Sequence, residues 1–264
     1  MYRSMKLNVK WANMKNMLLI SMLFFAALAC SSLQLPTAPT PFPTSTVQLS
    51  PTLVAPTPTA APAITLRSLA EEQGFWIGSA VSYEYLRADS SYAELVAREF
   101  NLLTTEDDLK FGPVHPEPDR YDFKGGDALV AFAQANGMAV RGHTLAWDSQ
   151  NPDWLIAGNY NREALMDILR EHIYTVVGRY QGQMAAWDVV NEAIDENGNL
   201  QDNIWLRGIG PDYIALAFQW AHEADPQANL FYNDQAAEGM NAKSEGVYAL
   251  LAPLGGDAGG RAGR

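Results

Sequence analysis

Short apolar runs alternate with stretches of helical spacing along most of the chain beyond residue 65. The runs FWIGSAV, FNLLTT, MAVRGHTL, MAAWDVV and ANLFY predict strands at 75–81, 100–105, 138–145, 184–190 and 228–232. Apolar residues at helical spacing, with Gly near several ends, predict helices at 66–74, 91–99, 126–136, 162–180, 212–224 and 242–251. This alternation is typical of βαβ units and a parallel sheet.

Polar residues gather at the C-terminal ends of four of the predicted strands or directly after them. The carboxyl ends of parallel strands form the active face of a (β/α)₈ barrel. A doubly wound sheet also binds ligands there, but no Gly-rich phosphate loop opens a helix after the first strand. The sequence therefore predicts an α/β fold of the (β/α)₈ TIM-barrel type. The polar groups are Glu106-Asp107 with Lys110, Gly142-His143-Thr144 with Trp147 and Gln150, Asn191-Glu192, and Asn233-Asp234.

The first residues of the chain resemble an export signal. Residues 1–15 carry four basic side chains and no acid, residues 17–29 are apolar, and Cys30 is the only cysteine. This pattern predicts a signal peptide over residues 1–30. The ending Ala27–Cys30 resembles a bacterial lipobox, which would make Cys30 a lipidation site. The alternative is ordinary cleavage near Ala29 beside an incidental cysteine.

Residues 31–64 predict a linker. The stretch 33–64 contains eight of the 15 prolines, interleaved with Thr, Ser and Ala, and such a segment favours extended, semi-rigid conformations. With the signal before it, this spacer indicates a secreted protein or a cell-surface lipoprotein of a bacterium. A lipid at Cys30 would make the membrane a partner.

Charge narrows the class of ligand. Residues 1–70 hold five basic residues and no acid, which leaves 13 basic against 30 acidic residues beyond them, a net charge of −17. Nucleic-acid binding depends mainly on Lys and Arg contacts to phosphates, so no nucleic-acid partner is expected. Neutral or weakly charged polymers are more suitable ligands.

Glu192 is the strongest candidate for chemistry. It follows the apolar run Trp187–Val190, at the point where a buried strand reaches a loop, and a carboxyl group there can act as a general acid. Asn191 beside it can hydrogen-bond a substrate hydroxyl. The structural alternative, in which Glu192 caps the next turn or pairs with a base, is less favoured after such a run. Sugar hydrolysis normally requires a second carboxylate.

The other polar residues have both functional and structural interpretations. Gly142 next to His143 allows a ligand to approach closely, and the aromatic face of Trp147 suits a pyranose ring, although Trp147 also fits a core position. Lys110 and Glu106 either bind sugar or form a surface ion pair. We interpret the remaining histidines as structural, and neither a zinc motif nor a Gly-x-Ser-x-Gly elbow is present, so no metal or other cofactor is expected. These histidines are His115, His172 and His222.

Several stretches together resemble glycoside hydrolase family 10, the retaining endo-β-1,4-xylanases built on (β/α)₈ barrels. They follow the family order over roughly residues 66–250 and include FWIGSAV, TTEDDLKF, VRGHTLAWDSQNPDWL, RYQGQMAAWDVVNEA, DYIALAFQWAHEADPQANLFYND and Lys243. The resemblance implies that Glu192 is the acid/base and that Asn191 holds the 2-hydroxyl of the sugar being cleaved. It further implies a first sugar subsite lined by His143 and Trp147, and a second, on the non-reducing side, with Glu106, Lys110 and Gln150.

Three positions near this site depart from the family pattern. Asp107 stands where Asn is usual, Phe111 where Trp is usual, and Asp148 where His is usual. Each change alters charge or size beside a sugar-binding residue. The resemblance therefore implies altered affinity or substrate preference, without implying loss of either.

The family's nucleophile, a Glu that ends the seventh strand, has no counterpart in this chain, because Glu238 and Glu245 follow no apolar strand. We therefore expect an incomplete barrel of about five strands over residues 65–254, followed by an aberrant Gly-rich tail at 255–264. A truncated or frame-shifted product is preferred to a naturally minimal enzyme. The prediction is a secreted endo-1,4-β-xylanase with a retaining mechanism, inactive as written, whose partner is xylan or another β-1,4-linked plant polysaccharide. The alternatives are a surface-tethered, non-catalytic xylan-binding lipoprotein and a related barrel β-glycanase.

Overall fold

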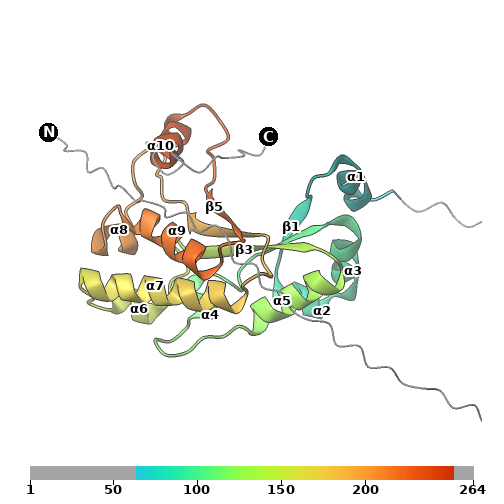
Figure 1. The fold of residues 1–264 in the computed structure, drawn as a ribbon, viewed down its shortest axis with the longest axis horizontal. Helices are drawn as coiled ribbons and strands as arrows, with labels where there is room; N and C mark the ends of the chain where they lie inside the picture. Colours follow the sequence, from blue (N-terminus) through green and yellow to red (C-terminus); the bar gives the residue numbers. More distant parts are fainter. Residues whose placement is uncertain (1–63, 253–264) are drawn as a thin grey trace, which may run out of the picture. The chain divides into compact units, whose positions relative to one another are not determined.

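A five-stranded parallel sheet forms the centre of the computed structural model, which describes residues 64–252 (Figure 1). The spatial order of the strands follows the sequence, so each βαβ connection joins neighbours. Because all pairs are parallel, the five carboxyl ends lie at one edge of the sheet. The strands are β1 (Gly78–Val81), β2 (Leu102–Thr105), β3 (Ala139–Ala146), β4 (Ala186–Asn191) and β5 (Asn229–Asn233). This arrangement confirms the predicted α/β class and corresponds to part of a (β/α)₈ barrel.

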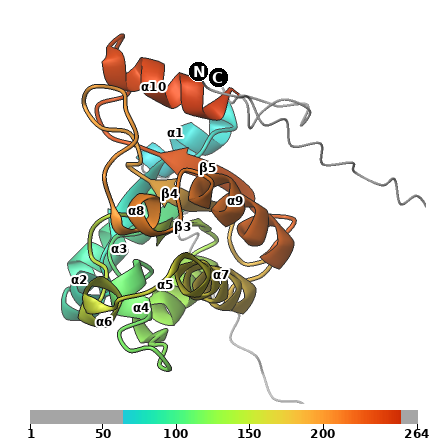
Figure 2. The same ribbon diagram turned by 90° about the vertical axis from the view of Figure 1, so that its left-hand side faces the viewer.

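Helices connect the strands, and three of the longer ones cover one face of the sheet (Figures 1 and 2): α5 (Lys124–Ala135), α7 (Arg162–Arg179) and α9 (Tyr213–Ala224). Figures 1 and 2 show α5 and α7 along this face, and α9 packs against both α7 and β4. The helices that follow the predicted pattern are α1 (Leu66–Gln73), α3 (Ser90–Glu99), α5 (Lys124–Ala135), α7 (Arg162–Arg179), α9 (Tyr213–Ala224) and α10 (Ala242–Leu251). Four short ones add to them: α2 (Tyr83–Ala88), α4 (Phe111–Val114), α6 (Asp153–Ala157) and α8 (Ile204–Gly208).

Helix α7 illustrates how the sequence sets an element. The side chain of Asn161 accepts a hydrogen bond from the Ala164 N–H at 2.9 Å, which caps the first turn. Buried residues then recur every three or four positions, at Leu165, Leu169, Ile173 and Val176. Burying this stripe against the sheet stabilises the helix more than its intrinsic propensity does.

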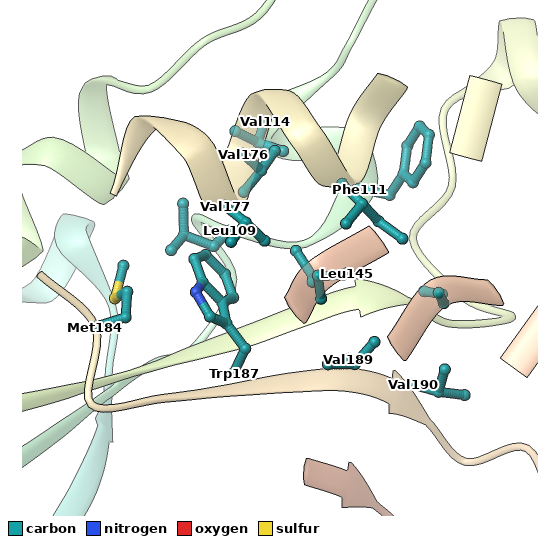
Figure 3. Close-up of a cluster of buried hydrophobic side chains, with 14 of the residues drawn as sticks. Leu109, Phe111, Val114, Leu145, Val176, Val177, Met184, Trp187, Val189 and Val190 are labelled. Carbon is teal, nitrogen blue, oxygen red and sulfur yellow. The ribbon is translucent and has the colours of Figure 1, made fainter. Parts of the chain in front are cut away.

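The core lies between the sheet and these helices. All six residues of β4 are buried, as its Val-rich sequence predicts for a strand covered on both faces. Trp187 and Val189 project from β4 toward Leu145, Val176 and their neighbours (Figure 3). The indole of Trp187 also explains the glycine that precedes His143.

Gly142 accommodates the core, so the interpretation of this glycine as room for a ligand is wrong. A Cβ atom at Gly142 would lie 2.3 Å from the Trp187 ring, which is too close, so only glycine fits at this position. Gly142 therefore faces the helices. His143, the next residue along the strand, faces the opposite side of the sheet.

The structure differs from the predicted elements mainly at their ends. Strand β1 begins at Gly78, and Phe75 and Trp76 lie before it with half-exposed side chains. The four short helices are too short to produce a recognisable period. No helix within residues 64–252 has the length and apolar character to span a membrane. The predicted signal peptide, Cys30, nearly all of the linker and the Gly-rich tail lie outside the described residues.

Candidate active site

Glu192 lies directly after β4, in a backbone conformation that is unusual for its residue type. Its φ of 51° is in the left-handed region, and its N–H donates to the carbonyl of Asn233 at 2.9 Å. Its half-buried carboxylate accepts a hydrogen bond at Oε2 from Trp147 Nε1 at 3.1 Å. The structure thus brings together two residues that the sequence places at the ends of different strands.

Asn191 ends β4 beside Glu192 and is itself buried. Its Oδ1 accepts a hydrogen bond from Asn233 Nδ2 at 2.7 Å, which fixes the amide plane. Its amide nitrogen donates to no group within residues 64–252 and remains a potential donor. The predicted pair Asn191-Glu192 therefore presents one donor and one carboxyl group at the same strand end.

His143 is oriented by a buried carboxylate. Its Nδ1 lies 2.9 Å from Asp188 Oδ2, and Asp188 is 1% exposed. Since a carboxylate accepts, Nδ1 carries the proton, and in a neutral ring Nε2 is then the acceptor that can receive a hydrogen bond from a hydroxyl group. Arg141 binds the other side of Asp188, through Nε at 2.9 Å from Oδ1, and also donates to Asn233 Oδ1 at 3.2 Å.

Sequence reasoning missed the roles of Arg141, Asp188 and Asn233 in this network. A signal was present, because Arg141 and Asp188 are charged residues inside otherwise apolar strand runs. Charges at such positions require a partner when the strand is buried. That requirement points to an ion pair between neighbouring strands, and β3 and β4 are neighbours.

Lys110 forms the second part of the site. Its ammonium group lies 2.8 Å from Asp107 Oδ1 and 5.1 Å from the centre of the Trp147 ring. Gln150 Nε2 approaches the same Asp107 oxygen at 3.4 Å, a long contact. The alternative ion pair between Lys110 and Glu106 is wrong, since the partner of Lys110 is Asp107. The hydrogen bond from Lys110 lowers the pKa of Asp107.

A cavity of about 510 Å³ opens on the side of the sheet that His143 faces, opposite α5 and α7 (Figure 1). Of the predicted residues, Glu106, Lys110 and His143 line it, together with Arg141 and Asp188. The remaining predicted residues do not line it. They are connected to its wall by the Lys110 and Asn233 contacts described above, and they are Asp107, Trp147, Gln150, Asn191 and Glu192.

Two histidines lie in the core, in the structural environment that we expected. The fully buried His172 ring stacks on Phe111 with ring centres 3.7 Å apart, and His115 stacks on Tyr121 at 4.1 Å. Burial holds the pKa of His172 well below its ordinary value of 6.5. Within residues 64–252, no group of three or more His, Cys, Asp or Glu side chains is arranged to hold a metal ion.

Comparison with known proteins identifies the family. Residues 65–257 fit the family described as "Glycosyl hydrolase family 10". The chain belongs to this family. Endo-1,4-beta-xylanase B of Thermotoga neapolitana is 44% identical over 193 residues, and Endo-1,4-beta-xylanase B of Paenibacillus barcinonensis is 45% identical over 186 residues. A crystal structure of xylanase 10B from Thermotoga petrophila RKU-1 in complex with xylobiose superposes with a TM-score of 0.72 at 41% identity.

These matches cover most of this chain but a smaller part of each relative. They span 72% and 68% of the chain against 56% and 55% of the two curated relatives. For the crystal structure they span 74% of the chain and 61% of the solved one. The family and its (β/α)₈ fold are thereby shown, whereas the activity of the whole protein is a matter for proposal.

Proposed function

We propose that this protein is an endo-1,4-β-xylanase that acts by retention, with Glu192 as acid/base. The observation that carries the proposal is the hydrogen bond from Trp147 to Glu192 at the ends of adjacent strands. The relatives also support the proposal, because two similar proteins are named endo-1,4-beta-xylanases. In this role, Glu192 protonates the oxygen of the leaving sugar and then activates the water that attacks.

The sugar that is cleaved lies beside Asn191 and His143 in this proposal. The Asn191 amide donates to the 2-hydroxyl, and the His143 Nε2 accepts from another hydroxyl. Trp147 stacks on the ring while its N–H holds Glu192. Lys110, Glu106 and Gln150 bind the next sugar on the non-reducing side.

Retention requires a second carboxylate about 5–5.5 Å from the acid/base. Among residues 64–252, Asp188 is bound by Arg141 and His143, and Asp234 is bound by Lys243 at 3.0 Å. Glu106 is placed with the second sugar. We therefore propose that residues 64–252 bind xylan and supply the acid/base, and that hydrolysis needs a carboxylate from outside them.

Calorimetry with the 264-residue chain tests this proposal. We expect binding of xylotetraose, no binding of the α-linked maltotetraose, and no measurable release of xylose or xylobiose. Glu192→Gln should preserve binding, whereas Asn191→Ala should weaken it about tenfold, as expected for a lost hydrogen bond to a buried group. A chain that binds neither glycan contradicts the proposed function.

Two further outcomes separate the alternatives. Equal binding of cellotetraose would favour a related β-glycanase over a xylanase. Hydrolysis by the 264-residue chain that is lost in Glu192→Gln would contradict the expectation that this chain releases no xylose or xylobiose. It would also distinguish an active enzyme from a non-catalytic xylan-binding lipoprotein.

We also propose that the protein is exported and anchored through a lipid on Cys30. The support is the basic and apolar sequence before this cysteine and the Pro-rich spacer after it. Bacterial cells fed a labelled fatty acid should incorporate the label into the wild-type chain but not into Cys30→Ala. An unlabelled wild-type chain recovered from the soluble fraction would contradict the anchor.

A further inference from the structure

The corner made by Glu106, Asp107 and Lys110 holds two carboxylates and one ammonium group. Lys110 and Glu106 line the cavity, whereas Asp107 does not. The Lys110 side chain is 11% exposed and that of Asp107 is 52% exposed, so Asp107 binds the ammonium group from the solvent side. Glu106 has no hydrogen-bonding or ion-pairing partner for its carboxylate among the described residues.

A ligand at this corner therefore meets a net negative charge. Asp107 neutralises Lys110, and the second cation that lines the cavity, Arg141, is neutralised by Asp188 at 2.5 Å. Glu106 remains as an uncompensated carboxylate in the cavity wall. An anionic group on a ligand meets this repulsion and must compete with Asp107 for Lys110.

Asp107 also restricts the Lys110 ammonium group in space. The group lies 2.8 Å from Asp107 Oδ1 and 5.1 Å from the centre of the Trp147 ring. An Asn at position 107 would retain an oxygen acceptor for Lys110 and Gln150 but remove the charge. The carboxylate, rather than the shape of the side chain, is what distinguishes this corner.

We propose that Asp107 is a specificity-determining positioning residue that makes the site select neutral over uronic-acid-bearing xylan segments. The proposal rests on the proposed function, since it takes β-1,4-xylan as the ligand. Asp107 acts through Lys110: it cancels the Lys110 charge, which would otherwise attract a uronate, and it leaves Glu106 to repel that uronate.

Calorimetry with the 264-residue chain compares three ligands: xylotetraose, xylotetraose with one glucuronic acid branch, and the neutral methyl ester of that branched ligand. The ester controls for the size of the branch. We expect the ester to bind about fivefold more tightly than the acid at low salt, as for one unscreened charge at the edge of a site, with the ratio falling toward one at about 0.5 M salt. Asp107→Asn should bring the low-salt ratio to one or below.

Two further variants show whether the effect is specific to this corner and whether Lys110 mediates it. Asp167→Asn removes the same charge from an i,i+3 ion pair with Arg170 on α7, outside the cavity lining, and should leave the ester-to-acid ratio unchanged. Adding Lys110→Met to Asp107→Asn should restore the preference for the ester. Near-ultraviolet circular dichroism verifies that each variant is folded.

Three results would overturn the inference. Wild-type protein that binds acid and ester equally at low salt has no charge selection, although xylotetraose binding would preserve the proposed function. An unchanged ratio in Asp107→Asn would exclude this residue as its source. Binding of none of the three ligands would overturn the proposed function and this inference together.

Discussion

Trp147 and Glu192 are joined by a hydrogen bond of 3.1 Å between the indole Nε1 and the carboxylate Oε2. Trp147 follows β3 and Glu192 follows β4, so this bond connects the ends of two adjacent strands. It leaves one oxygen of Glu192 without an indole partner. Trp147 therefore makes two contacts in the site: its N–H binds the Glu192 carboxylate, and its ring lies beside Lys110.

Replacing Trp147 with Phe tests the hydrogen bond to Glu192. The variant keeps an aromatic ring but removes the donor to Glu192, so we expect a loss of about 1 kcal/mol in the free energy of unfolding. We also expect weaker binding of xylotetraose. Urea denaturation and calorimetry measure the two effects. Trp76→Phe, at a half-exposed tryptophan before β1, should change neither, and equal losses in both variants would show that the Trp147 contact is unimportant.

The sequence predicts much of this architecture because its signals are local. The Val-rich run of β4 and the apolar stripe of α7 each identify their element without reference to the rest of the chain. The same holds for the polar residues after β2, β3 and β4, since parallel strands bring their carboxyl ends together. Asn191, Glu192 and Trp147 meet for this reason.

Pairwise contacts between strands are harder to predict from the sequence. The partner of Lys110 depends on whether Glu106 or Asp107 points toward it, and a loop has no period that decides this. Gly142 illustrates the same difficulty, because glycine is required there by the Trp187 ring, which belongs to another strand. The ion pair of Arg141 with Asp188 depends on the register between β3 and β4.

Asp188→Asn should destabilise the protein through this ion pair. The Asp188 side chain is 2% exposed, and the variant leaves Arg141 without a compensating charge and His143 without its orienting carboxylate. We expect a loss of about 2 kcal/mol, less than for a fully buried pair because the Arg141 side chain is 29% exposed.

Urea denaturation measures this loss against a matched control. Asp167→Asn breaks an ion pair whose two side chains are more than half exposed, and it should cost less than about 0.5 kcal/mol. If the two variants lose the same stability, the network around Asp188 has no special role in the fold.

His172 should make stability depend on pH. Its pKa is well below 6.5 in the folded chain because the ring is buried, whereas in the unfolded chain it is near 6.5. Below that pH the unfolded state binds a proton that the folded state does not bind, so stability falls as the pH decreases. The slope from this residue approaches about 1.4 kcal/mol per pH unit below pH 6.5.

His172→Phe isolates this contribution. Within residues 64–252, neither ring nitrogen of His172 has a hydrogen-bonding partner, so a Phe ring can replace the imidazole in its stack on Phe111 without losing a hydrogen bond. We expect the variant to gain stability relative to wild type at about pH 5 and to differ less at about pH 7.5. Part of the slope should remain, because burial also lowers the pKa of His115. A parallel pair of stability curves would contradict the assignment to His172.

Lys243 should determine how firmly α10 is attached to the sheet. Its ammonium group lies 3.0 Å from Asp234 Oδ1, after β5, and 3.0 Å from Glu196 Oε1, in the loop after β4. The Lys243 and Asp234 side chains are 4% and 2% exposed, so Lys243→Met leaves a buried carboxylate without its cation. We expect a loss of about 3 kcal/mol, with amide exchange in α10 about a hundredfold faster.

Hydrogen exchange of residues 242–251 measures this effect, and Glu196→Gln is its matched control. Glu196 binds the same ammonium group but its side chain is 73% exposed, so its removal should cost under about 1 kcal/mol and leave exchange in α10 nearly unchanged. The contrast separates a buried contact from an exposed one on a single lysine. If Lys243→Met left exchange in α10 as slow as in the wild type, the apolar contacts of α10 alone would attach it, and Asp234 would have to be neutralised by another group.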